Sequence, residues 1–169
     1  MFELDTTSIS AMVAAAGVLV GVTISIIELR NIVKARQGEL FLDLYDHYND
    51  PTFVRRFSEI VFNWSWKDYD DWREKCSPET NIKAYSSWAS VGNYFKGVGV
   101  LVDEKMIDAR LVEKLMGEPF LKYWEKCEPI IKEFRKDHKM PKAWETAEHL
   151  YNELKKREQW LQQSTAKGE

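Results

Sequence analysis

The chain has 169 residues and a formal net charge of −3, which allows a membrane anchor plus one soluble domain of about 120 to 140 residues. Beyond Glu3 and Asp5 it carries 24 basic and 25 acidic residues, so the near-neutral balance excludes nucleic-acid binding through a general basic excess. Cys76 and Cys127 form no Cys-x-x-Cys pair, and we expect two buried, reduced thiols.

Residues 6–27 contain no charged side chain and are mostly apolar. As a helix, residues 8–27 would be about 30 Å long, which matches the hydrocarbon thickness of a bilayer. We therefore predict a transmembrane helix over residues 8–27, preceded by a short extracytoplasmic N-terminus over residues 1–7. One alternative is a signal peptide, which needs basic residues before a shorter apolar run. The other is a buried core helix, which is usually shorter and rarely uncharged.

The charges that flank this segment predict its orientation. Arg30, Lys34 and Arg36 follow it, whereas the residues before it contain neither lysine nor arginine. Because cytoplasmic flanks are enriched in lysine and arginine, we expect a single-pass protein of the cell membrane with its N-terminus outside and its C-terminal domain in the cytoplasm. The lipid bilayer is then the first expected partner.

Small residues recur along one face of the apolar segment, at Ser10, Ala14, Gly17, Gly21 and Ser25. Helices in lipid associate where small side chains let backbones approach, and Gly17 with Gly21 forms a Gly-x-x-x-Gly match. We predict a self-association face. The alternative is that glycine, alanine and serine are simply common in membrane helices.

The helical apolar pattern continues past the segment through Leu29, Val33, Leu40, Leu44 and Tyr48. We predict one helix from about Thr7 to Tyr48, in which residues 28–49 form a stalk. Asn49-Asp50-Pro51 marks its end, because proline cannot continue a helix and favours a new start.

Residues 50–161 are predicted to form a compact cytoplasmic helical bundle, so the fold class is all-α. The predicted helix starts are Asp50-Pro51, Ser77-Pro78, Asp108, Pro119 and Pro141. We expect the helix from Asp108 to end at Gly117. We expect residues 97–102 to continue a helix although they resemble a strand. Residues 162–169 are expected to form a disordered tail.

The seven tryptophans are an unusual feature of this composition. Most lie on predicted apolar helix faces, where filling the core is the expected role. Trp64, Trp66, Tyr69 and Trp72 are different, because they crowd a turn-like segment beside aspartate and lysine. Since indole suits half-exposed surfaces, we predict a contact with a partner or with lipid headgroups here, and the alternative is that these rings fill the core as well.

Motifs for chemistry are weak. Gly97-Val-Gly99 lacks the preceding strand and the third glycine of a phosphate loop, so close helix packing is the better interpretation. Asp43 with His47 has a metal-ligand spacing, but a site needs three or four ligands. We predict no catalytic, cofactor-binding or metal residues, no cofactor and no nucleic-acid partner.

Several segments together carry a resemblance: the acidic N-terminus and single span, Asn49-Asp50-Pro51, Tyr94-Phe-Lys-Gly-Val-Gly-Val-Leu101, Tyr123-Trp124 before Pro129, and Trp144 before Leu150-Tyr151. The chain resembles an uncharacterised family, a domain of unknown function, of small prokaryotic single-span membrane proteins with a C-terminal cytoplasmic helical domain. The resemblance covers most of the chain. It implies this layout and brings no activity.

The expected function is a membrane-anchored helical interaction module that self-associates or serves as an accessory subunit of a membrane-protein assembly. An enzyme is disfavoured, because His47, His138 and His149 are scattered and complete no recognisable catalytic set. The alternative is a membrane-tethered ligand-sensing or enzymatic helical domain. A pore is disfavoured because few strongly polar residues share one side of the span.

Overall fold

The computed structural model describes residues 6–166 of the chain. These residues are helical with turns and contain no strand, which confirms the all-α prediction. The chain divides into two compact units, one up to Phe41 and one from Leu42 onward. We call the second unit the helical domain. The predicted extracytoplasmic N-terminus lies largely outside the described residues, which begin at Thr6.

The first element is α1, Thr6–Tyr48, a single helix of 43 residues. Its bounds confirm the predicted continuous helix, and Gly38 does not interrupt it. It ends where Asp50 and Pro51 begin α2, Pro51–Ser58. The carboxylate of Asp50 accepts hydrogen bonds from the backbone N–H groups of Thr52, at 2.8 Å, and Phe53, at 3.1 Å. Asp50 is therefore the N-cap that the sequence predicted.

Helix α2 passes directly into a π-helical turn, η1, Glu59–Asn63. After an extended segment, α3, Tyr69–Cys76, is capped by the Asp68 side chain. The next helix, α4, spans Ile82–Asp103 and is capped by Asn81. The predicted start at Ser77-Pro78 is wrong, because Ser77 to Thr80 form a turn before this helix. Residues 97–102 are helical, as expected.

The predicted helix end at Gly117 is wrong, because a second π-helical turn continues the helix through this residue. Helix α5, Ala109–Val112, continues through η2, Glu113–Gly117, into α6, Glu118–Asp137. Gly117 has φ −62° and ψ −58°, a right-handed helical conformation rather than a left-handed cap. The wider π turn precedes Pro119, which has no N–H for the usual i to i−4 hydrogen bond.

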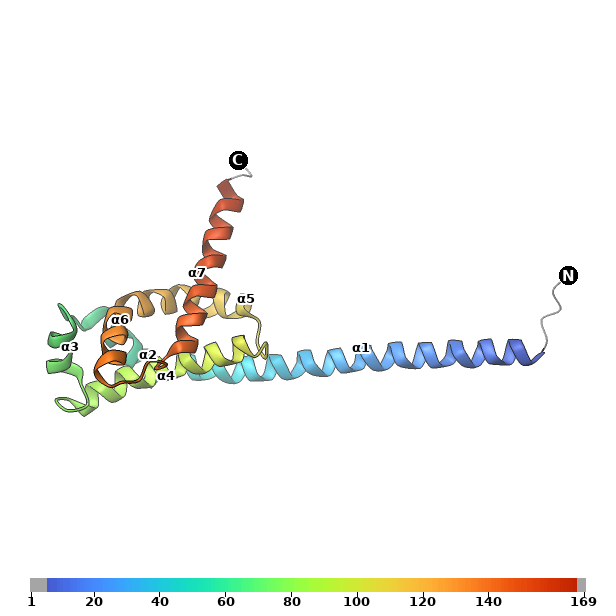
Figure 1. The fold of residues 1–169 in the computed structure, drawn as a ribbon, viewed down its shortest axis with the longest axis horizontal. Helices are drawn as coiled ribbons and strands as arrows, with labels where there is room; N and C mark the ends of the chain where they lie inside the picture. Colours follow the sequence, from blue (N-terminus) through green and yellow to red (C-terminus); the bar gives the residue numbers. More distant parts are fainter. Residues whose placement is uncertain (1–5, 167–169) are drawn as a thin grey trace. The chain divides into compact units, whose positions relative to one another are not determined.

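The last helix, α7, spans Glu145–Ala166. The predicted start at Pro141 is wrong, because residues 141–144 form turns and Trp144 has a positive φ of 55°. The predicted disordered tail began at Gln162, but α7 continues to Ala166, and residues 167–169 lie outside the described residues. Helix α7 crosses α4, and its C-terminal part extends beyond the other helices of the domain (Figure 1).

An aromatic core holds the helical domain together. Its largest fully buried side chains include Trp72, Trp88, Phe95, Phe120, Tyr123 and Trp124. Each aromatic residue buries a large apolar area, and ring pairs such as Trp72 and Trp88, 4.9 Å between centroids, add to that burial. Most tryptophans therefore fill the core, as predicted.

Close packing against α4 depends on two of its glycines, and one of them faces α7. A Cβ atom at Gly92 would lie 2.7 Å from Nε1 of Trp144. A Cβ atom at Gly99 would overlap the backbone carbonyl of Thr146, whereas at Gly97 it would meet no heavy atom within 4 Å. The packing interpretation of Gly97-Val-Gly99 is thus confirmed at Gly99 alone.

Candidate functional site

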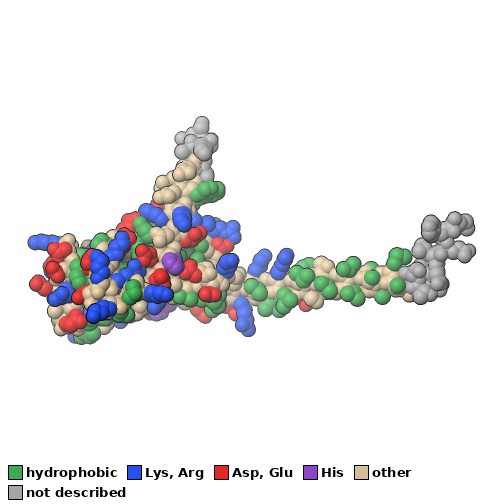
Figure 2. Space-filling model, viewed as in Figure 1, with side chains coloured by type: hydrophobic (Ala, Val, Ile, Leu, Met, Phe, Trp, Pro, Cys, Tyr) green, Lys and Arg blue, Asp and Glu red, His purple; other side chains and the backbone are tan. Residues whose placement is uncertain are grey.

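The first candidate surface is the small-residue face of α1. Ser10, Ala14, Gly17, Gly21 and Ser25 all lie within this helix and are exposed. A Cβ atom added at Gly17 or Gly21 would meet no heavy atom within 4 Å, so this backbone is open to a neighbour. Figure 2 shows hydrophobic side chains along much of α1.

Two hydroxyl groups in the apolar part of α1 are satisfied inside the helix. Ser25 Oγ donates to the carbonyl of Gly21 at 3.0 Å. Thr23 Oγ1 donates to the carbonyl of Leu19 at 2.8 Å. Such back-bonding removes the need for water, which makes these side chains compatible with a lipid environment.

The second candidate is the aromatic segment between η1 and α3, and the structure divides its four predicted residues. Trp72 is fully buried and packs on Trp88, so it belongs to the core and is not available to a partner. Trp64, Trp66 and Tyr69 are half-buried. The sequence pattern grouped Trp72 with the other three because it follows them within a few residues. In the structure Trp72 belongs to α3, and this helix directs the Trp72 side chain into the core.

Tyr69 is held in place by polar contacts rather than left free for a ligand. Its hydroxyl donates to Oδ2 of Asp137 at 2.9 Å, and its ring stacks on Trp72 with centroids 5.6 Å apart. Burial, together with this hydrogen bond, raises the pKa of Tyr69. The exposed part of the segment therefore centres on Trp64 and Trp66.

Lys126 of α6 fixes the conformation of this segment. Its Nζ donates to the carbonyl oxygens of Val61, at 2.9 Å, and Trp64, at 2.6 Å, at the end of η1. The same ammonium lies 5.2 Å from the ring centroid of Trp66. Carbonyls at a helix end have no partner within the helix, so Lys126 supplies one. Desolvation lowers the pKa of Lys126.

Sequence reasoning missed Lys126. The available signal was its position on α6 next to the buried residues Trp124 and Cys127, at the edge of the apolar face. A lysine there extends its aliphatic chain along the core and brings its charge to the rim. The pairing with Val61 and Trp64 spans more than 60 residues of sequence, so no local pattern indicates it.

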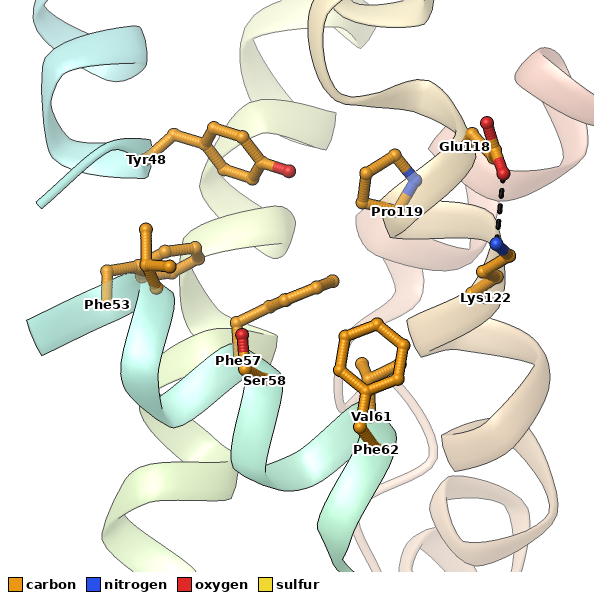
Figure 3. Close-up of a pocket in the computed structure, with 10 residues that line it drawn as sticks. Tyr48, Phe53, Phe57, Ser58, Val61, Phe62, Glu118, Pro119 and Lys122 are labelled. Atoms are coloured by element: carbon orange, nitrogen blue, oxygen red, sulfur yellow. Dashed lines mark hydrogen bonds and ion pairs between the residues drawn. The ribbon is translucent and has the colours of Figure 1, made fainter. Parts of the chain in front are cut away.

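The third candidate is an apolar groove that the sequence did not predict. It lies between α2–η1 and the start of α6, has a volume of about 390 Å³, and is shown in Figure 3. Phe53, Phe57 and Tyr48 form its aromatic wall, and Pro119 lies across from them. Phe62 also lines the groove and is 69% exposed.

The acidic and histidine residues that have metal-ligand spacings serve other roles. His47 stacks on Tyr94 with ring centroids 5.4 Å apart, and Asp50 caps α2. His149 Nδ1 lies 3.1 Å from Oδ2 of Asp103 at the surface. Within residues 6–166, no three histidine, cysteine or acidic side chains are grouped so that they could hold a metal ion.

The fold and these surfaces define a class: an all-α protein with a long apolar N-terminal helix, followed by a helical domain with an aromatic core. Residues 11–154 match the family described as "Domain of unknown function (DUF4760)", and the chain belongs to this family. This confirms the expected membership of an uncharacterised family. No curated protein and no solved structure shows significant similarity to the chain.

Proposed function

We propose that the protein is a single-pass, membrane-anchored helical interaction module that self-associates or serves as an accessory subunit of a membrane-protein assembly. One observation carries this proposal. Near the N-terminus, α1 is long and apolar enough to cross a bilayer, and its apolar stretch is not buried within the structure. Val18 and Leu19, for example, are 65% and 68% exposed. Water would be an unfavourable environment for so large an apolar surface, whereas lipid would not.

The proposed orientation places the N-terminus outside and the helical domain in the cytoplasm. It rests on Arg30, Lys34 and Arg36, which follow the apolar stretch within the first turns beyond it. Lysine and arginine favour the cytoplasmic side, where anionic headgroups add further attraction.

The small-residue face of α1 is the proposed self-association surface within the bilayer. Lipid tails are as apolar as the helix, so helices pair there through close packing. Gly17 and Gly21 leave the backbone accessible over one turn, and a second helix can approach closely only where such side chains are small.

The anchor is tested on the full chain in native membranes. We expect the protein to stay in the pellet after alkaline carbonate extraction. We also expect a C-terminal fluorescent-protein fusion to fluoresce while a C-terminal alkaline phosphatase fusion is inactive. Release into the supernatant would refute the anchor, and an active phosphatase fusion would reverse the proposed topology.

Self-association is tested with Gly17→Ile and Gly21→Ile in mild detergent. Bulk on this face should raise the dissociation constant of the oligomer by about tenfold or more, equivalent to about 1.4 kcal/mol. Ala15→Ile is the matched control, because position 15 lies away from this face, about 160° around the helix from Gly17 and about 120° from Gly21. Unchanged oligomer mass in the glycine variants, or an equal loss in the control, would reject this face.

A further inference from the structure

The apolar surface of α1 does not end with its uncharged run. Leu29, Ile32 and Val33 follow Ile27 and are 62%, 57% and 54% exposed. At about 1.5 Å per residue, they carry the apolar surface about 9 Å further along the helix. The headgroup layer on each side of a bilayer is about 5 to 8 Å thick. For an anchored chain, this part of α1 therefore lies at the depth where hydrocarbon gives way to headgroups.

Three cations lie within the same part of the helix. Arg30, Lys34 and Arg36 are exposed, and among the residues that the structure describes none of them has an acidic partner. Glu28 is the one acid within residues 28–38, so three cations and one acid leave this segment with a net charge of +2. Long cationic side chains can lay their stems on apolar surface and still bring their charges to the headgroups.

The cations surround the helix instead of forming one face. At about 100° per residue, Lys34 lies about 40° from Arg30, whereas Arg36 lies about 120° from Arg30 in the opposite direction. Figure 2 shows Lys and Arg side chains projecting from α1 where its hydrophobic stretch ends. A protein partner would contact one side of the helix, whereas headgroups surround a helix that crosses a bilayer. We call these three residues the cationic collar.

We propose that the cationic collar binds the phosphate groups of anionic phospholipids. The inference rests on the membrane anchor proposed above and names the lipid that the anchor selects. A guanidinium group binds phosphate through two parallel hydrogen bonds, so Arg30 and Arg36 suit this ligand. Cations without acidic partners can bind it without breaking an ion pair. Each adds about fivefold to the preference for an anionic surface, which corresponds to about 1 kcal/mol.

The first experiment measures which lipid lies beside the collar. The full chain with Asn31→Cys, labelled there with a fluorophore, is reconstituted in phosphatidylcholine vesicles that contain a minority of spin-labelled lipid. Cys76 and Cys127 are buried and are not expected to react. With the nitroxide at the same acyl position, quenching should give phosphatidylglycerol an association constant at least about fivefold above that of phosphatidylcholine. Equal quenching by the two lipids would overturn the proposal.

The second experiment assigns this preference to the collar. In the labelled chain that also carries Arg30→Gln, Lys34→Gln and Arg36→Gln, the two lipids should quench almost equally, because the amide side chains keep their polarity but lose their charge. High salt should likewise reduce the preference of the parent chain, since exposed charges are screened. A preference that persists in the triple variant would contradict the proposal.

A control variant removes the same amount of charge elsewhere. Lys122→Gln, Lys132→Gln and Lys136→Gln together replace three exposed cations of α6 and should leave the preference unchanged. An equal loss in this control would show that net charge, and not the collar, selects the lipid. Energy transfer between labelled copies, together with equal quenching by both lipids, would show that a second copy covers the collar and would also overturn the proposal.

Failure of this inference is distinguishable from failure of the anchor. Both leaflets of these vesicles have the same composition, so the measurement does not depend on the orientation of the chain. A chain that does not float with vesicles of phosphatidylcholine alone would refute the anchor. A chain that floats with them but shows no preference for phosphatidylglycerol would retain the anchor and lose the lipid-binding collar.

Discussion

Gly99 of α4 lies so close to Thr146 of α7 that a Cβ atom at position 99 would overlap the backbone carbonyl of Thr146. Two residues earlier, a Cβ atom at Gly97 would meet no heavy atom within 4 Å. The two glycines share a helix and a sequence motif, but only one of them sets the distance between α4 and α7.

We expect Gly99→Ala to lower the free energy of unfolding of the helical domain by about 1 to 3 kcal/mol or more, because two backbones must separate. Gly97→Ala should be neutral or should stabilise by up to about 1 kcal/mol, since alanine favours the helix. Chemical unfolding of the full chain in mild detergent, followed by tryptophan fluorescence, measures both. Equal effects of the two substitutions would contradict the close packing at Gly99.

Local signals predicted the helix α1 and its end correctly. A long uncharged apolar run strongly favours a helix. The N-cap Asp50 and Pro51 act within one turn of the chain, so a local pattern is enough to predict them. The predicted boundaries at Gly117 and Pro141 were wrong because packing overrode the local preference. Gly117 is buried and helical within η2. In the turn before α7, Trp144 has a positive φ and its ring packs on Trp88 and Phe134.

The candidate surfaces were predictable only where their residues are neighbours in sequence. The face of α1 follows from helical spacing and needs no fold. The groove forms only because α2–η1 and α6 lie side by side. Lys126 can cap η1 only because α6 brings it to the end of that turn. Both features therefore depend on contacts between segments that are distant in sequence. Burial of Trp72 likewise depends on Trp88 and Phe134, which lie on other helices.

Lys126→Met should destabilise the end of η1. Removal of the ammonium leaves the carbonyls of Val61 and Trp64 without their donor, which costs about 1 to 3 kcal/mol for buried groups. Hydrogen exchange should increase in residues 59–68. Lys122→Met, one turn earlier on α6, removes only an exposed ion pair and should change stability by less than about 1 kcal/mol. Similar exchange in both variants would rule out a capping role.

Trp72 and Trp66 should respond differently to truncation. Trp72→Ala empties a fully buried site and should cost about 3 to 5 kcal/mol of unfolding free energy. Trp66→Ala removes a half-exposed ring and its contact with Lys126, worth about 0.5 to 1 kcal/mol. Thermal unfolding of both variants measures the two losses of stability. A larger loss of unfolding free energy in Trp66→Ala than in Trp72→Ala would contradict the assignment of Trp72 to the core.

Alkaline pH should destabilise the domain in a defined window. Burial raises the pKa of the Cys127 thiol to about 12, and it also raises the pKa of Tyr94. In the unfolded chain the pKa is about 8.5 for cysteine and about 10 for tyrosine. Above these pH values the unfolded state therefore binds fewer protons than the folded state. The stability that these neutral groups contribute is complete below those values and is lost as pH rises toward about 12.

Unfolding free energy measured between pH 8 and pH 11 tests this sign. Cys127→Ala should flatten the first part of the decline, although it lowers stability at every pH by removing a buried atom. Native protein should also resist thiol alkylation at Cys127 until it unfolds, because the thiolate is the reactive form. Rapid labelling under native conditions would show that the site opens.

Trp144 adopts a positive φ of 55° and presses its indole toward Gly92. A left-handed tryptophan is an uncommon backbone state, and its ring is retained by Trp88 at 4.7 Å and Phe134 at 5.4 Å between centroids. A Cβ atom at position 92 would therefore collide with this indole. A bulkier residue at 92 would require a smaller one at 144, so the two sites should drift as a pair among descendants of this chain.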